Sequence, residues 1–184
     1  NIDTDTIIPS REMKTTGRAG LADGLFAPWR YTDAAARVRD PAFVLNQRDA
    51  IGTRLLLAGR NFGCGSSREH AVWAMAEFGI EAIIAPSFAP IFKANCLRNG
   101  LLPVELPEEV VQSLQWKMVR IDLPAQTVTA GDRQWQFDID PEAKQMLLEG
   151  LDAIDLTRKS QPEIDRWLAR DRIERPWIYL GEES

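Results

Sequence analysis

Residues 55–71 constrain the fold of this chain more than any other stretch, because an apolar run, two glycines and a polar cluster follow one another directly. The three leucines at 55–57 are typical of a short strand that is buried on both faces. Gly63 and Gly65 come next, and glycine adopts backbone conformations that are closed to other residues. The sequence therefore predicts a buried strand that leads into a glycine loop.

The polar cluster after the loop is typical of a helix start. Ser66 and Glu69 have the S-x-x-E spacing of a capping box, and residues 71–76 are apolar all round, as in a buried helix. A helix that begins at Ser66 directs unpaired N–H groups and a partial positive charge at the loop, and Arg68 adds a full positive charge. This pattern predicts a site for an anion.

Other known motifs fit these residues poorly. A dinucleotide fingerprint requires a third glycine where Arg68 stands and an acidic residue where residues 85–87 stand. A phosphate loop ends in Gly-Lys-Ser/Thr, which is absent here. A serine hydrolase needs a histidine from elsewhere in the chain, whereas the only histidine is His70. Spacing alone leaves one alternative open, in which Ser66 only caps the helix and Arg68 is a solvated charge.

The run from residue 61 to residue 70 resembles the signature of the swivelling domain of the aconitase superfamily, in the form carried by small subunits of 3-isopropylmalate dehydratase. Further matches occur in the family's order at residues 1–9, 84–89, 99–104 and 150–152. The resemblance extends from residue 1 to about residue 157. The resemblance implies a swivelling β/β/α fold and a hydro-lyase made of a large and a small subunit, with the chemistry between them.

The chain beyond the glycine loop predicts an α/β fold. Apolar runs at 82–85 and 101–104 are typical of buried strands, and a helical stretch at 88–98 lies between them, so a parallel sheet is expected. Further strands are expected at 117–123, 126–129 and 135–139, and further helices at 108–115, 141–149 and 162–172. The expected architecture is a mixed sheet with a parallel core and helices packed around it. We expect one domain over residues 1–184, with residues 158–184 as a C-terminal helical extension.

The composition argues against several classes of partner. The chain has 184 residues, a net charge of −5 and a pI near 5.0, which disfavours nucleic acid or an anionic membrane. No apolar run approaches the ~20 residues of a membrane span. Cys64 and Cys96 lack a disulfide-framework spacing and suit free thiols in a reducing compartment, so we expect a cytoplasmic protein.

Side chains that bind iron or zinc are few. Iron–sulfur and zinc sites take three or four Cys or His ligands, and this chain has one histidine and two cysteines. We therefore expect it to bind no cluster by itself, with Cys64 as a small buried packing residue and His70 as a structural histidine. The resemblance implies that a [4Fe-4S] cluster lies on a large partner subunit, in a heterodimer or a heterotetramer.

Two segments near the N-terminus bear on the site. Residues 3–9 predict a turn that enters a short strand stopped by Pro9, and the resemblance implies that Asp5 faces the active site in a supporting role. Residues 10–25 hold three glycines and mixed charges without a clean period, which predicts an irregular, mobile loop. The resemblance implies that Arg18 lies beside the substrate and that this loop senses the group that distinguishes one substrate from another. A solvated loop charge is the alternative for Arg18.

The resemblance also assigns the chemistry. Ser66 is the expected catalytic base, an alkoxide stabilised by the helix start, the loop N–H groups and an arginine. Ser67 and the backbone around Gly65 are expected to hold the substrate, and Arg68 is expected to bind a carboxylate through bidentate hydrogen bonds of its guanidinium. The expected reaction interconverts 2-isopropylmalate and 3-isopropylmalate, small dicarboxylates of leucine biosynthesis, through loss and re-addition of water. The alternatives are a related dehydratase for citramalate, homoaconitate or another substituted malate, and a non-catalytic anion-binding module.

Overall fold

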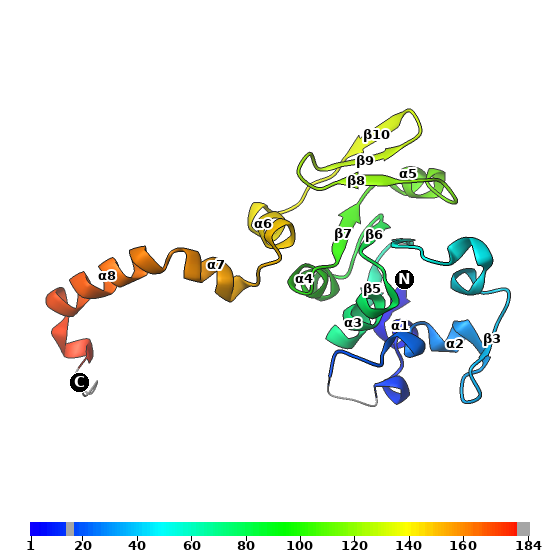
Figure 1. Ribbon diagram of the computed structural model, residues 1–184, viewed down its shortest axis with the longest axis horizontal. Coiled ribbons are helices and arrows are strands. Elements are labelled where there is room, and N and C mark those ends of the chain that lie inside the picture. The colour runs from blue at the N-terminus through cyan, green and yellow to red at the C-terminus, as the bar shows by residue number, and fades with distance from the viewer. Residues whose placement is uncertain (14–16, 180–184) are drawn as a thin grey trace.

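A three-stranded parallel sheet lies at the centre of the computed structural model, which describes residues 1–13 and 17–179 (Figure 1). Its strands are β4 (Leu55–Leu57), β6 (Ala82–Ala85) and β7 (Leu102–Glu105), in the order β4-β6-β7. The middle strand β6 is buried along its whole length, as is usual for an apolar strand of a parallel sheet. The three strands predicted for the parallel core are confirmed to within one residue.

One face of the parallel sheet packs against helices α3 (Glu69–Phe78) and α4 (Pro90–Arg98). Ile83 and Ala85 of β6 belong to this side and share a buried core with Met75 of α3. Burial of apolar surface, at roughly 25 cal/mol per Å², is the main stabilising contribution in such a core. The helix expected at 88–98 is confirmed as α4.

Helix α3 is not buried on all sides, which corrects the expectation for residues 71–76. Trp73 is half-buried, and Ala76 and Glu77 are exposed. The buried side comprises Ala71, Val72, Ala74 and Met75. Alanine is small enough to occupy either a core or a surface position, so a run rich in alanine does not show which side of a helix faces the solvent.

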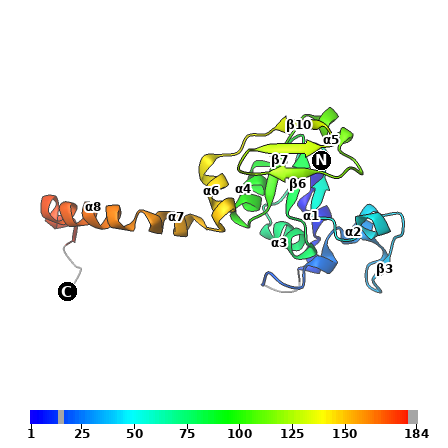
Figure 2. The ribbon, with the colours of Figure 1, turned by 45° about the horizontal axis from the view of Figure 1, so that its top comes forward.

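The opposite face of the parallel sheet packs against helix α5 (Glu108–Ser113) and an antiparallel sheet. The strands of this second sheet are β8 (Arg120–Asp122), β9 (Thr127–Ala130) and β10 (Arg133–Gln136), in the order β10-β9-β8. Ile84 of β6 and Val128 of β9 are fully buried between the two sheets. The layers are thus antiparallel sheet, parallel sheet and helices (Figure 2), which confirms the expected α/β fold of the β/β/α type.

A short parallel pair of strands lies at the N-terminus. β1 (Ile2–Asp3) pairs with β5 (Phe62–Cys64), and Phe62 also forms a bridge with Phe88. The glycine loop expected after β4 therefore contains a strand. This pairing depends on a partner that lies about 60 residues away in sequence, so no local pattern marks it.

The strand expected before Pro9 is wrong, because this segment forms helix α1 (Thr4–Ile7). The carboxylate of Asp3 accepts a hydrogen bond from the Thr6 N–H at 2.6 Å and so caps the helical turn. Ile7 is fully buried, and so is Ile8, which follows the helix. A helical turn therefore buries these two isoleucines as well as a strand would.

Short elements connect this segment to β4. They are η1 (Ser10–Glu12), η2 (Ala22–Gly24), α2 (Ala27–Arg30), β2 (Tyr31–Asp33), β3 (Val38–Arg39), η3 (Val44–Asn46) and η4 (Arg48–Ala50). Residues 14–16 of the loop expected at 10–25 lie outside the described residues. The rest of that loop contains the two 3-10 turns η1 and η2 at its ends.

The C-terminal segment extends away from the three layers as a helical arm (Figures 1 and 2). Helix α6 (Pro141–Glu149) packs near α4, and α7 (Ala153–Lys159), α8 (Gln161–Glu174) and η5 (Pro176–Tyr179) continue outward. The predicted start of the extension at residue 158 falls inside α7, so the arm begins earlier than expected. Asp152 and Asp155 form a capping box that starts this helix.

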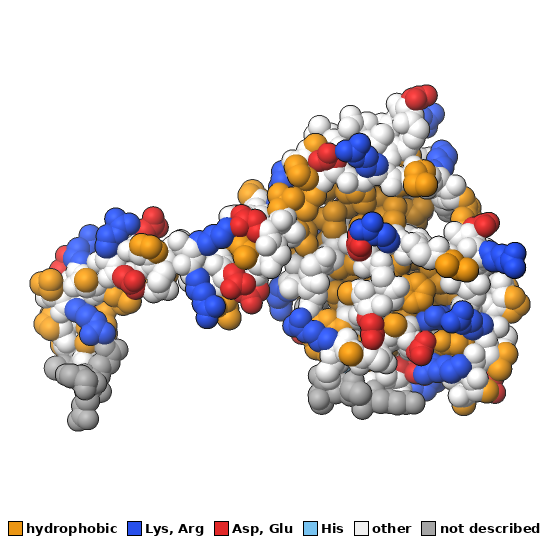
Figure 3. Space-filling model, in the orientation of Figure 1, with side chains coloured by type: hydrophobic (Ala, Val, Ile, Leu, Met, Phe, Trp, Pro, Cys, Tyr) orange, Lys and Arg blue, Asp and Glu red, His pale blue; other side chains and the backbone are white. Residues whose placement is uncertain are grey.

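Hydrophobic side chains are exposed along the arm (Figure 3). They include Ile154, Trp167, Ile173, Trp177 and Ile178. Residues 180–184 of the expected extension lie outside the described residues. No helix in the described part of the chain combines the length and the apolar character needed to cross a membrane.

Candidate active site

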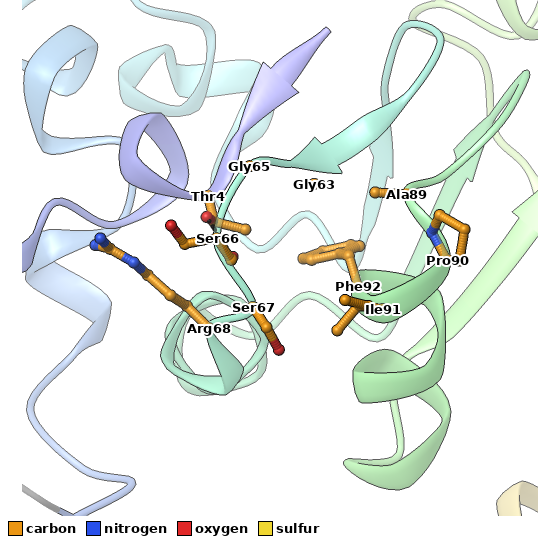
Figure 4. A pocket seen from close by; sticks show the side chains of 10 residues that line it. All are labelled: Thr4, Gly63, Gly65, Ser66, Ser67, Arg68, Ala89, Pro90, Ile91 and Phe92. Atoms are coloured by element: carbon orange, nitrogen blue, oxygen red, sulfur yellow. Dashed lines mark hydrogen bonds between the residues drawn. The ribbon is translucent and has the colours of Figure 1, made fainter.

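The loop between β5 and α3 lines a pocket of about 180 Å³ (Figure 4). One wall is this loop, and the other wall is the start of α4. The lining residues are Thr4, Gly63, Gly65, Ser66, Ser67, Arg68, Ala89, Pro90, Ile91 and Phe92. Four of the six site residues predicted from the sequence therefore share one pocket.

Two glycines give this loop its course. Gly63 has φ of 76° and Gly65 has φ of 88°, a region that side chains with a Cβ disfavour. A Cβ on Gly63 would lie 2.1 Å from Cγ of Phe92, so the backbone approaches that ring as closely as only glycine allows. A Cβ on Gly65 would meet the Asp3 side chain at 3.3 Å. The loop is thus held between α4 and the N-terminal segment.

Replacement of Gly63 by alanine is expected to destabilise the fold by about 2–5 kcal/mol, because strain at positive φ adds to overpacking against Phe92. Denaturant unfolding of this variant and of a control variant measures the loss in free energy of unfolding. Gly59→Ala is the matched control, since Gly59 has open space around it and no positive φ. Equal stability of the two variants would contradict the close approach of the backbone to Phe92.

Helix α3 begins at Glu69 and not at Ser66, which corrects the predicted capping box. Its N-cap residue is Arg68, and no side chain among the described residues caps it. Glu69 instead accepts a hydrogen bond from Nδ2 of Asn99 at 3.3 Å. The alternative in which Ser66 only caps the helix is therefore wrong.

The backbone of Ser66 is fixed from the N-terminal segment. Thr4 is buried, and its Oγ1 donates a hydrogen bond to the Ser66 carbonyl at 2.8 Å. Ser66 itself is exposed, and within the described residues its hydroxyl makes no hydrogen bond. The loop thus holds the serine backbone and leaves the hydroxyl without a hydrogen-bond partner among the described residues.

Arg68 extends from the loop toward the N-terminal segment, away from Ile91 and Phe92 on the other wall (Figure 4). Its Nη1 lies 2.6 Å from Oδ1 of Asp5 and donates a hydrogen bond to Oγ of Ser10 at 2.9 Å. Both contacts use one nitrogen of the guanidinium. Asp5, predicted to support the site, is thus a direct partner of Arg68.

Arg18 lies farther along the surface of α3. Its guanidinium carbon is 5.3 Å from the ring centroid of Trp73, a cation–π distance. An open hollow of about 610 Å³ borders this ring and shares Ser67 and Arg68 with the pocket. The structure therefore places Arg18 near an extension of the site, outside the residues that line the pocket itself.

Three contributing residues escaped the prediction from sequence. Thr4 and Ser10 hold the loop and Arg68, and Phe92 forms the far wall. Thr4 stands between the two aspartates of the N-terminal motif, and this position was the available signal for it. Ser10 and Phe92 come from ordinary loop and helix sequence and give no comparable signal.

The Cys and His side chains do not form a metal site. Cys64 lies on β5 and is half-buried, which corrects the expected full burial, and Cys96 is buried in α4, where burial raises the pKa of its thiol. The ring of His70 lies against Trp73, with 4.8 Å between the ring centroids. Over residues 1–13 and 17–179, no three Cys, His, Asp or Glu side chains are grouped to hold a metal ion. These donors do not fit an iron–sulfur cluster.

Two family models match the chain. The first is described as the aconitase C-terminal domain and matches residues 1–109. The second is described as LeuD_N and matches residues 118–141. The first match includes the pocket, the N-terminal segment and the parallel sheet.

Curated relatives match nearly the whole chain. A protein of Cupriavidus necator named 3-isopropylmalate dehydratase small subunit is 54% identical, over 98% of this chain and 91% of that protein. A protein of Phenylobacterium zucineum with the same name is 49% identical, over 97% of this chain and 90% of that protein. A crystal structure of 3-isopropylmalate dehydratase from Methanocaldococcus jannaschii is similar with a TM-score of 0.65 and 28% identity, over 90% of this chain and 92% of that one.

Proposed function

Because this chain belongs to the family of 3-isopropylmalate dehydratase small subunits, we propose that its pocket provides the proton-transfer half of a hydro-lyase for 2-isopropylmalate and 3-isopropylmalate. The family places the chain in leucine biosynthesis and pairs it with a large subunit. The observation that carries the proposal is the position of Ser66 and Arg68 in one pocket, with the serine hydroxyl unused by the helix cap.

The chemistry requires a base and a cation at the same place. A proton on carbon beside a carboxylate is a weak acid, so its removal needs a positioned base and positive charge that stabilises the developing anion. Ser66 supplies the oxygen, and Arg68 supplies the charge. The ten-residue helix α3 adds the unpaired N–H groups of its first turn directly after this loop.

Each remaining site residue has a role in this proposal. Arg68 holds a substrate carboxylate, and Ser67 and the backbone at Gly65 fix its orientation beside Ser66. Asp5 orients the guanidinium of Arg68 through their ion pair. Arg18 contacts the variable group of the substrate from the loop at residues 10–25.

We propose that the large subunit carries the [4Fe-4S] cluster, because the three Cys and His residues of this chain are separated on β5, α3 and α4. The cluster supplies Lewis acidity toward the leaving hydroxyl group. The proposal further includes a cytoplasmic heterodimer or heterotetramer, and a single swivelling domain over residues 1–184.

An assay of the chain reconstituted with its large subunit tests the substrate and the role of Arg68 together. Among several malate derivatives, isopropylmalate is expected to give the highest kcat/KM. Arg68→Lys keeps the charge but loses the planar fork, so kcat/KM is expected to fall by roughly 10- to 150-fold. Arg60→Lys is the matched control, since Arg60 forms a surface ion pair with Glu108.

Each outcome of this assay has a distinct meaning. A higher kcat/KM for citramalate or homoaconitate would reassign the substrate and keep the chemistry. An unchanged kcat/KM in the Arg68→Lys variant would contradict carboxylate binding by this residue. The complete absence of turnover with every malate derivative would favour a non-catalytic anion-binding module.

A further inference from the structure

One carboxylate on helix α3 holds the end of the loop at residues 10–25. The side chain of Glu77 accepts hydrogen bonds from three successive backbone N–H groups, those of Gly20, Leu21 and Ala22, at 2.7, 2.5 and 2.8 Å. These bonds lower the pKa of Glu77, with the Gly20 N–H as the largest cause. Glu77 is therefore ionised at neutral pH, the state that accepts all three bonds.

A buried cation, Arg30, also binds the backbone at Ala22. Nη1 of Arg30 donates a hydrogen bond to the Ala22 carbonyl at 2.7 Å. Arg30 is only 5% exposed, and its guanidinium lies against the rings of Tyr31 and Phe78. Phe78 is the neighbour of Glu77 on α3. Both polar groups of the Ala22 backbone are thus bound, one by a carboxylate and one by a guanidinium.

The beginning of the loop is joined to its end. The buried carboxylate of Glu12 pairs with Nη2 of Arg37 at 2.5 Å, and Nη1 of Arg37 donates to the Asp23 carbonyl at 3.2 Å. The backbone at Gly24 is so close to Glu12 that a Cβ on this glycine would lie 2.6 Å from the Glu12 Cβ. The two ends of the loop are therefore fixed against each other as well as against α3.

Helix α3 aligns this loop with residues 65–68 of the loop that precedes the helix. Trp73 and Glu77 are four residues apart and lie on the same side of the helix. Glu77 binds residues 20–22, and Trp73 lies under Arg18. The same helix starts directly after Arg68. One rigid element therefore carries the attachment points of both loops.

We propose that Glu77 is a positioning residue that holds Arg18 at a fixed place relative to Ser66. This inference rests on the proposed function, in which Arg18 contacts the substrate. Glu77 itself lies beyond the pocket and acts through the backbone of residues 20–22. Its removal is expected to weaken substrate binding without a change in proton transfer by Ser66.

Amide hydrogen exchange of the chain alone tests the attachment without any assay of activity. Glu77→Gln keeps the size of the side chain, but its NH₂ group repels the loop N–H groups and only one oxygen accepts. The amides of Gly20, Leu21 and Ala22 are expected to exchange about 10-fold faster in this variant. Glu81→Gln is the matched control, because Glu81 is exposed and pairs with Arg54 on the surface.

Kinetics of the reconstituted enzyme test the consequence for the substrate. Glu77→Gln is expected to raise KM about 10-fold and to leave kcat within about twofold, as loss of uniform substrate binding does. Arg18→Ala is expected to act in the same way. If Glu77 acts through Arg18, the double variant has nearly the same KM as Arg18→Ala alone, because the two effects are not additive.

The possible results distinguish the positioning role of Glu77 from the substrate contact of Arg18. Unchanged exchange at residues 20–22, or additive effects of the two substitutions on KM, would overturn the positioning role of Glu77. A normal KM in Arg18→Ala, together with faster exchange in Glu77→Gln, would instead overturn the substrate contact of Arg18. If kcat of the Glu77→Gln variant falls by the same factor as KM rises, Glu77 supports the whole site. This result would also overturn its specific role in positioning Arg18.

Discussion

The purified chain without its partner is expected to show no dehydratase or hydratase activity and to contain no stoichiometric iron. Three thiolate ligands are the usual minimum for a cluster, and this chain has two cysteines in all, on separate elements. Elimination of hydroxide from a malate at neutral pH calls for a Lewis acid. Metal analysis and an assay of the same sample measure both properties.

Activity is expected only after anaerobic mixing with a large subunit that carries a cluster. The mixture has a built-in control, since each subunit alone is assayed beside it at the same concentration. Turnover by the isolated chain, or stoichiometric metal bound to it, would refute the proposed division of labour between the subunits. The effect expected on mixing is the largest of those described, from no turnover to full turnover.

Ser66→Ala is expected to reduce turnover of the reconstituted enzyme by about 10²- to 10⁴-fold, the usual contribution of a positioned base. Its stability is expected to stay close to that of the unchanged chain, because the hydroxyl makes no hydrogen bond within the described residues and caps no helix. An N-cap serine would instead cost ~1 kcal/mol when replaced by alanine.

Thermal melting and an assay of one preparation decide between these roles. Ser113→Ala is the control, since Ser113 donates to a backbone carbonyl within α5, away from the pocket. A clear loss of stability with near-normal turnover would contradict the base assignment for Ser66. A loss of turnover equal to that of the control variant would contradict it as well.

The parallel core was predictable because its signals are local. Three apolar runs and the helices between them predict a parallel sheet, and the glycine at the end of α6 indicates where that helix stops. The sequence predicts a strand where helix α1 forms, because two adjacent isoleucines suit either structure. The cap by Asp3 decides between the two structures, and an aspartate at that position also fits a turn.

The candidate site was predictable where its residues are contiguous. Residues 65–68 form one loop, so a single motif reveals them together. Their supports come from far away in the sequence: Thr4 reaches Ser66 across 62 positions, and Ser10 reaches Arg68 across 58. Such contacts arise only when β1 pairs with β5, and no periodicity or spacing encodes that pairing. The sequence does not mark Glu77 either, because this residue follows an apolar run that predicts a buried helix.

The ion pair between Arg68 and Asp5 has a consequence for how a substrate enters. Asp5 and Ser10 both use Nη1, so a substrate carboxylate binds the remaining N–H groups of the guanidinium while Asp5 stays paired. The paired guanidinium presents little net charge at a distance, and diffusing anions are therefore attracted only weakly to it. Dissolved salt screens this long-range attraction more strongly than the short contact itself, so the position selects an anion mainly by direct contact.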